Sequence, residues 1–304
     1  MNYLSNLFQQ IQQTIPIYCP TVLSTKVGRT PKVSDVQLCA LYILSYITNI
    51  PVLNLAKTLI DSSIQSWHLF RKERTKRIYK LLREYMQNRA MSIIFLKLLL
   101  GEKVRLIVDG TILEVAKLSR ARTQKIKRFS GKAFWGKKKR KLYSHHYKRE
   151  VEFEELYYGV LVMVLCDENG VVYDIWFHPA SYNEVKSFRL RKSKSKWFKF
   201  LVETFEVIGD KGYRGCEHVV VCKRKESKSI RQAVEGVNSQ IKVFNYISRW
   251  RKGITLLAYL YGYAIGYSFF RKSYVLRWFL IQRIFLHYSN WIEGKKCLTL
   301  YSLR

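Results

Sequence analysis

The sequence predicts an α/β protein in which a helical N-terminal region precedes a sheet with flanking helices. Residues 1–100 have the character of successive helices, which Gly101 ends. At residue 103 the pattern changes to short apolar runs bounded by turn residues, as in buried strands. From about Lys228 to Tyr246 the apolar residues return to helical spacing.

Within the helical region, Ser34 and Asp35 predict a helix start, because an apolar run follows them directly. The tripeptide Asn49-Ile50-Pro51 then interrupts the chain, and Pro51 suits the first turn of a second helix that ends near Asp61. Two short helices joined by a tight turn suggest a helix-turn-helix. The same pattern occurs in many helical hairpins that never touch DNA.

The second part of the chain contains several predicted strands. Residues 103–110 form a short apolar run that we expect to end at Asp109. Residues 157–180 predict a hairpin whose turn is residues 167–170, with Asp174 facing solvent. A fourth strand lies just before Asp210, and residues 218–224 suggest a fifth.

The charge balance indicates a polyanionic partner. The chain of 304 residues carries 54 Lys and Arg against 22 Asp and Glu, a formal charge of +32. Such an excess opposes compaction by self-repulsion, so we expect a compensating ligand, with double-stranded DNA the first choice. An anionic membrane surface is the rival, since residues 253–270 are uncharged over a length close to that of a membrane helix. Four tyrosines within that segment favour a buried core helix and no membrane partner.

The N-terminus lacks the basic and apolar regions of a secretory signal. The six cysteines contain no C-x-x-C pair, which argues against a zinc ribbon or a disulfide framework and predicts buried, inert thiols. We therefore expect a cytoplasmic, nucleoid-associated protein.

Two basic stretches interrupt the α/β part. Residues 117–149 hold 14 Lys or Arg and no acid, interleaved with five aromatic residues, and residues 186–199 add seven more basic residues. Cations neutralise phosphates and rings stack on bases, so this composition favours DNA contact over a solvated face. The run that we single out is Lys137, Lys138, Lys139, Arg140 and Lys141.

Three acids stand out because they lie at strand ends or on a helix in so basic a chain. Asp109 and Asp210 follow predicted strands, and Glu235 lies on the helix from about Lys228. Carboxylates are the ligands that Mg²⁺ prefers, and two-metal phosphoryl transfer needs several of them. Around the axis of an ideal helix, Glu235 falls about 40° and Lys242 about 20° from Arg231. An apolar stripe lies on another face, well away from these three residues. The alternative is an exposed ion pair between Arg231 and Glu235.

These motifs together resemble those of DDE-type insertion-sequence transposases. The resemblance rests on VDGT around Asp109, IGDKGYRG around Asp210, and R-x₃-E-x₆-K from Arg231 through Glu235 to Lys242, and it spans about residues 103–250. The residues GRTPKVSD before the first predicted helix are also similar to the DNA-binding part of one branch of that family. The family often has Tyr three residues before the Arg, where this chain has Lys228.

The resemblance implies a ribonuclease-H-like mixed sheet and a catalytic and metal-binding triad of Asp109, Asp210 and Glu235. It also implies two Mg²⁺ or Mn²⁺ ions. DNA contacts are assigned to Arg231, Lys242 and Lys211 as well as to residues 137–141, and a homo-oligomer on DNA is expected. Glu184 is a lesser site candidate, because relatives often carry an acid after a Pro-Ala dipeptide such as Pro179-Ala180.

The predicted organisation is a DNA-binding region at 1–100, a catalytic domain at 101–270 with a basic insertion at 117–149, and a basic, aromatic helical tail at 271–304. The predicted function is a transposase that cleaves transposon ends and transfers the strands into target DNA. The alternatives are a nuclease of the same fold without strand transfer, or a basic nucleic-acid-binding protein without catalysis.

Overall fold

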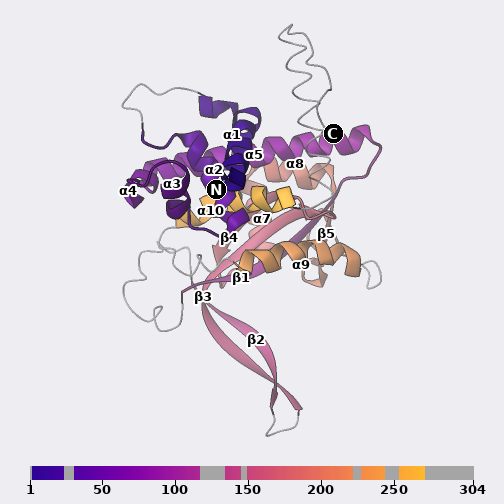
Figure 1. Cartoon of the computed structure of the whole chain (residues 1–304). Coiled ribbons are helices and arrows are strands. Elements are labelled where there is room, and N and C mark those ends of the chain that lie inside the picture. The colour runs from indigo at the N-terminus through magenta and orange to yellow at the C-terminus, as the bar shows by residue number, and fades with distance from the viewer. Residues whose placement is uncertain are drawn as a thin grey trace.

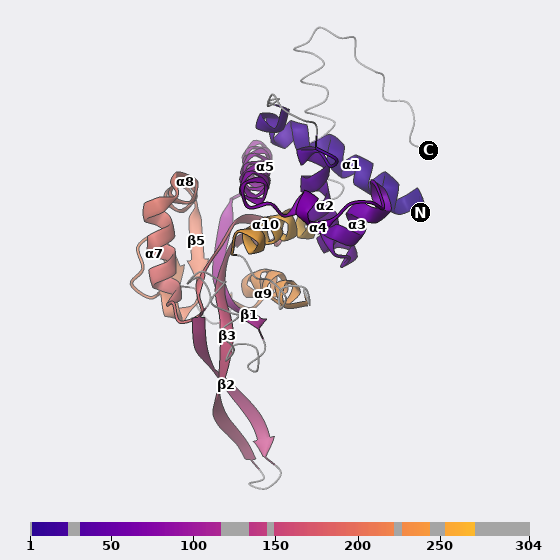
Figure 2. The same ribbon diagram turned by 90° about the vertical axis from the view of Figure 1, so that its left-hand side faces the viewer.

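The computed structural model describes residues 2–23, 31–116, 134–144, 149–221, 227–243 and 253–270. They form a mixed α/β fold in which helices cover both faces of a curled, mixed sheet (Figures 1 and 2). The predicted α/β class is therefore confirmed. The predicted tail at 271–304 and most of the basic insertion, including its two adjacent histidines His145 and His146, lie outside the described residues.

The N-terminal part consists of helices, as predicted. Their bounds are α1 Asn2–Tyr18, the 3₁₀ helix Pro20–Leu23, α2 Asp35–Thr48, α3 Val52–Leu59, α4 Ser66–Leu69 and α5 Lys72–Leu99. The predicted start at Ser34 is confirmed, since Ser34 and Gln37 form a reciprocal capping box. Asn49 ends α2 in the left-handed conformation, and α3 leaves at 112° to α2. This angle fits a helix-turn-helix, whose DNA contact stays a prediction.

The sheet contains six strands in the described residues, namely β1 Arg105–Ala116, β2 Phe134–Ser144, β3 Arg149–Asp167, β4 Val172–Pro179, β5 Glu206–Gly209 and β6 Val219–Val221. The order is β2-β3-β1-β5-β6, and β4 also pairs with β3. Strands β1 to β4 pair antiparallel, whereas β5 and β6 add to β1 in parallel. The predicted hairpin and the strands before Asp210 and after Cys216 are confirmed.

One strand boundary was predicted wrongly. We expected the first strand to end at Asp109, but β1 continues to Ala116, because β3 pairs with it from Leu106 to Ala116. The parallel pairing of β1 with β5 stops at Ile107, two residues before Asp109.

The N-terminal half of β3 and all of β2 form a two-stranded ribbon that protrudes from the sheet (Figures 1 and 2). Its register runs from the pair Phe134↔Gly159 to the pair Ser144↔Arg149. The basic run 137–141 therefore lies on β2, opposite the acid-rich residues 152–156 of β3.

Alternation along the strands assigns each side chain to one face of the sheet. Leu106 and Val108 belong to the core that α7 (Glu184–Lys194) and α8 (Lys196–Thr204) cover. Ile107 belongs to the other core, beneath α9 (Ser227–Val243) and α10 (Gly253–Phe270). That second core also contains residues of α1, α2, α3 and α5, so the helical region and the sheet share one hydrophobic cluster.

Helix α10 is the buried core helix that the sequence predicted. Gly262 and Gly266 allow close approach to α2, since a Cβ on Gly262 would lie 2.8 Å from the Tyr42 carbonyl oxygen and one on Gly266 would lie 2.7 Å from the Tyr46 ring. Tyr42 and Tyr46 pack edge-to-face on Tyr259 and Tyr263. Over the described residues, no single helix passes a length-and-hydropathy test for a membrane span, and only the bent pair α2–α3 does so jointly.

Two buried ion pairs tie the elements together. Asp167 lies in the β3–β4 turn as predicted, and its carboxylate accepts a bond from Lys97 Nζ of α5 at 2.7 Å. Asp174 was predicted to face solvent, and this was wrong. Its side chain lies on β4, is completely buried, and accepts two hydrogen bonds of 2.8 Å from Arg191 of α7.

Candidate functional site

Strand register places Asp109 and Asp210 level with each other on adjacent parallel strands. Ile107 pairs with Ile208, so the residues two positions further along the chain are Asp109 and Asp210. The pairing of β1 with β5 ends at Ile107 and Ile208, before the two aspartates, because β5 ends at Gly209 and the chain turns into a short 3₁₀ helix at Lys211–Tyr213. The Asp210 carboxylate accepts a bond from the Gly212 amide at 2.8 Å, which fixes its direction. Both side chains are half-buried.

Glu184 joins these two acids from the first turn of α7. Asn183 caps the helix by accepting bonds from the Val185 and Lys186 amides. The Glu184 carboxyl lies against the bare Cα of Gly110, where an added Cβ would come within 2.6 Å of it. This contact explains why glycine follows Asp109, since any side chain there would displace Glu184.

The three carboxyls interact electrostatically. Burial, then the charge of Asp109, then that of Asp210 raise the pKa of Glu184 to about 7. Tyr213, almost fully buried, donates its hydroxyl to Glu184 at 3.4 Å. Burial, followed by the charges of Glu184, Asp109 and Asp210, raises the pKa of Tyr213 as well.

Helix α9 crosses this site and contacts Asp109 through Asn238. The apolar side chains Val234, Val237 and Ile241 are buried in the core, as the helical wheel predicted. Asn238 is also buried, and its Nδ2 donates to Asp109 Oδ2 at 2.8 Å. Glu235 lies on α9 one turn before Asn238 and is exposed.

The predicted site residues are thus partly brought together. The described contacts unite Asp109, Asp210 and the lesser candidate Glu184, and they add Asn238 and Tyr213. Glu235 and Lys242 are exposed on α9, with Arg231 on the same helix, and Lys211 is exposed next to Asp210. Asn238 and Tyr213 were missed. Tyr213 lies within the IGDKGYRG motif, and Asn238 falls between the apolar stripe and Glu235 on the wheel, so both positions offered a signal.

The donor set can be compared with what a divalent cation requires. Over the residues described, no three His, Cys, Asp or Glu side chains are grouped so that they could hold one metal ion. Magnesium is commonly held by only one or two carboxylates, with water and substrate phosphate oxygens as its other ligands. The Asp109 and Asp210 carboxylates satisfy that requirement. Among the described residues, the buried Asn238 Oδ1 has no hydrogen-bond partner, so the side chain that donates to Asp109 also carries one more hard oxygen.

In the ribbon of β2 and β3, acidic residues of β3 lie opposite the basic residues of β2. Lys137, on β2, is exposed and pairs with Glu154 of β3 at 2.9 Å. The register also sets the backbone of Lys138 opposite Glu155, Lys139 opposite Glu154, Arg140 opposite Phe153 and Lys141 opposite Glu152. The second basic stretch, residues 186–199, forms α7 and α8, where Arg191 and Lys192 are engaged in ion pairs.

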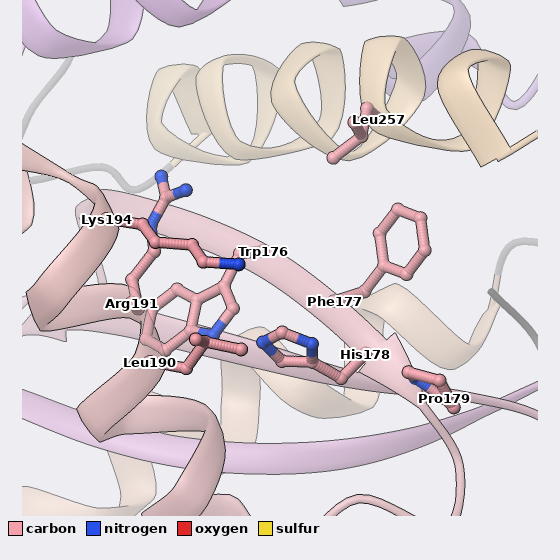
Figure 3. Close-up of a pocket in the computed structure, with 8 residues that line it drawn as sticks. All are labelled: Trp176, Phe177, His178, Pro179, Leu190, Arg191, Lys194 and Leu257. Atoms are coloured by element: carbon pink, nitrogen blue, oxygen red, sulfur yellow. The ribbon is translucent and has the colours of Figure 1, made fainter.

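A cavity of about 370 Å³ lies apart from these acids, between β4, α7 and α10 (Figure 3). Its lining comprises Trp176, Phe177, His178 and Pro179 from β4, Leu190, Arg191 and Lys194 from α7, and Leu257 from α10. Burial, together with Lys194 and Arg191, lowers the pKa of His178, so its imidazole is neutral at neutral pH. The lining therefore combines aromatic surface with cations.

A scan against protein-family models, a search of curated proteins and a search of solved structures found no match to this chain.

Proposed function

We propose that this chain is a DDE-type transposase with a ribonuclease-H-like catalytic domain, which cuts transposon ends and joins them to target DNA. The observation that carries the proposal is the meeting of β1, β5 and α9 at Asp109 and Asp210. The motif resemblance requires acids from these three elements in this order. The formal charge of +32 supports a polyanionic substrate.

The roles proposed for the residues follow the motif resemblance. Asp109 and Asp210 hold the cation, and Glu235 approaches from α9, one turn from the contact between Asn238 and Asp109. Two Mg²⁺ or Mn²⁺ ions bound there would activate the attacking oxygen and stabilise the leaving one. Lys211 follows Asp210 directly and Lys242 lies further along α9 than Glu235; both are exposed and neutralise DNA phosphates.

The reaction has two stages. Water attacks a phosphorus atom at the transposon end, which breaks the bond to the 3′ oxygen and leaves a 3′-hydroxyl and a 5′-phosphate. The hydroxyl oxygen then attacks a phosphorus of the target strand, and the target's 3′ oxygen departs. A nuclease without strand transfer would stop after the first stage.

The test uses a labelled duplex that carries the DNA flanking the gene on either side, together with a supercoiled target plasmid and Mg²⁺. We expect cleaved and joined products from the wild-type chain. Asp109→Asn, Asp210→Asn and Glu235→Gln should each reduce the cleavage rate on the order of 10²–10³-fold or more, while duplex binding persists. Glu217→Gln, at an exposed acid paired with Lys192, is the matched control and should cleave normally.

The outcomes separate the candidates. Cleavage without joining would identify a nuclease, and duplex binding without cleavage would identify a non-catalytic binding protein. Normal cleavage by any one of the three variants would remove that residue from the site.

A further inference from the structure

The amide of Asn238 is the least satisfied polar group at the site. The side chain is 6% exposed, its Nδ2 donates to Asp109, and its Oδ1 meets no hydrogen-bond donor from the part of the chain that the structure describes. Leaving a buried acceptor unsatisfied is energetically unfavourable, because the group loses its hydrogen bonds to water. Such an oxygen needs an explanation, and a cation ligand is one that its chemistry allows.

The orientation of the amide is consistent with that chemistry. Exchanging the positions of its oxygen and nitrogen would direct Oδ1 at the Asp109 carboxylate, where two oxygens would repel each other. With Nδ2 on Asp109, the oxygen is the other arm of the same amide and keeps its lone pairs for a different partner. A hard divalent cation accepts carboxylate and Asn carbonyl oxygens in the same coordination shell.

The fold fixes the position of Asn238 firmly. Around the axis of α9, Asn238 falls between Val234 and Glu235, about 40° from the first and about 60° from the second. The buried stripe of Val234, Val237 and Ile241 sets the rotation of α9, and Tyr263 of α10 donates to the Val237 carbonyl at 2.7 Å. The helix therefore directs Asn238, which adjoins the stripe, towards Asp109.

We propose that Asn238 supplies a neutral oxygen ligand to the divalent cation held by Asp109 and Asp210. This inference rests on the proposed function, because it assumes that the acids hold a cation. It assigns α9 two contributions, the amide of Asn238 at the buried side of the site and the carboxylate of Glu235 at the exposed side. The alternative is that Asn238 only positions Asp109 through Nδ2.

The experiment measures Mn²⁺ affinity by isothermal titration calorimetry, with and without duplex DNA, and needs no turnover. Asn238→Ala should weaken Mn²⁺ binding by about tenfold or more, as the loss of groups around a metal typically does. Asn238→Asp should bind Mn²⁺ more tightly than wild type, since it exchanges a neutral oxygen ligand for an anionic one. Ser239→Asp adds the same charge at an exposed neighbour and should change the affinity little.

A purely positioning Asn238 gives the opposite result for one variant. Asn238→Asp would lose the donor to Asp109 and add repulsion, so Mn²⁺ binding would weaken relative to Ser239→Asp. That result, wild-type affinity in Asn238→Ala, or no Mn²⁺ binding by wild type in either condition overturns the inference. Melting curves identify variants that fail to fold. The proposed function is judged separately, by DNA cleavage and joining.

Discussion

Two sets of acids in the described part of the chain have different surroundings. Asp167 and Asp174 are fully buried, and each is paired with a cation, Lys97 or Arg191. Asp109, Asp210 and Glu184 are grouped together and accept bonds from neutral donors, the Asn238 amide, the Gly212 amide and the Tyr213 hydroxyl.

The contrast is visible along a single helix. The last turn of α7 carries Arg191, which donates two hydrogen bonds to Asp174 and interacts electrostatically with Tyr261 of α10. Its first turn carries Glu184, which forms no ion pair in the described part of the chain and whose pKa is raised to about 7. Paired acids hold α7, β4 and α10 together, whereas the grouped acids repel one another. Groups with perturbed pKa values that gather at one place are typical of functional sites.

The paired set should dominate stability. Asp174→Asn leaves the Arg191 guanidinium without its carboxylate in a largely buried position. Removing one partner of a buried ion pair typically costs about 3–5 kcal/mol in the free energy of unfolding. Urea unfolding followed by circular dichroism measures this loss.

The matched control is Glu73→Gln, which removes one partner of the exposed pair with Lys76 and should leave the urea midpoint where it is. If Asp174→Asn were as stable as this control, the distinction between paired and grouped acids would lose its energetic basis.

In the grouped set, neutralising an acid should raise the free energy of unfolding at neutral and higher pH, whereas Asp174→Asn lowers it. Burial and the two aspartates raise the pKa of Glu184 from 4.5 to about 7, so the folded state binds this proton more tightly than the unfolded state does. The resulting contribution to the free energy of unfolding is fully present below pH 4.5. That stability is lost as the pH rises to 7. Glu184→Gln removes this loss, so the variant should exceed wild type by roughly 3 kcal/mol at pH 8 and match it at pH 4.

Unfolding in EDTA at both pH values measures this difference. The control is Glu203→Gln on α8, an exposed acid, which should show no such pH dependence. An equal effect of Glu184→Gln at pH 4 and pH 8 would mean that Glu184 does not share its site with the two aspartates.

Much of this arrangement could be predicted from the sequence where local pattern decides. The capping box at Ser34, the turn at residues 167–170, the strand before Asp210 and the apolar stripe of α9 all follow from spacing of a few residues. Asp109 and Asp210 were predicted to share a site from the motifs around them, and the parallel pairing of β1 with β5 brings the two positions level with each other.

Other features depend on contacts between distant segments, which local pattern does not encode. Asp174 alternates with apolar neighbours and so predicted a solvent-facing side chain, but Arg191 from the next helix buries it. The length of β1 beyond Asp109 depends on β3. Glu184 gains its place through Gly110, which is distant in sequence, and Asn238 through the rotation that the core imposes on α9.

The smallest effect is expected at an exposed pair, in the ribbon of β2 and β3. Lys137 and Glu154 are 2.9 Å apart, with side chains 66% and 53% exposed. Such an exposed pair contributes little to stability, so substituting either residue should leave the fold intact. If the ribbon contacts DNA, Glu154 competes with phosphate for Lys137.

Glu154→Gln should therefore strengthen duplex binding modestly, and Lys137→Gln should weaken it. Each phosphate contact that is lost should reduce the slope of log affinity against log salt by about 0.9. Lys103→Gln, outside the ribbon, removes the same charge and should leave the slope nearly unchanged. Fluorescence anisotropy over a range of salt concentrations measures the slopes. If Lys137→Gln kept the wild-type slope, as the control Lys103→Gln should, Lys137 would not contact DNA. The ribbon would then be a solvent-exposed element whose Lys137–Glu154 pair resembles the exposed surface pair of Lys76 with Glu73.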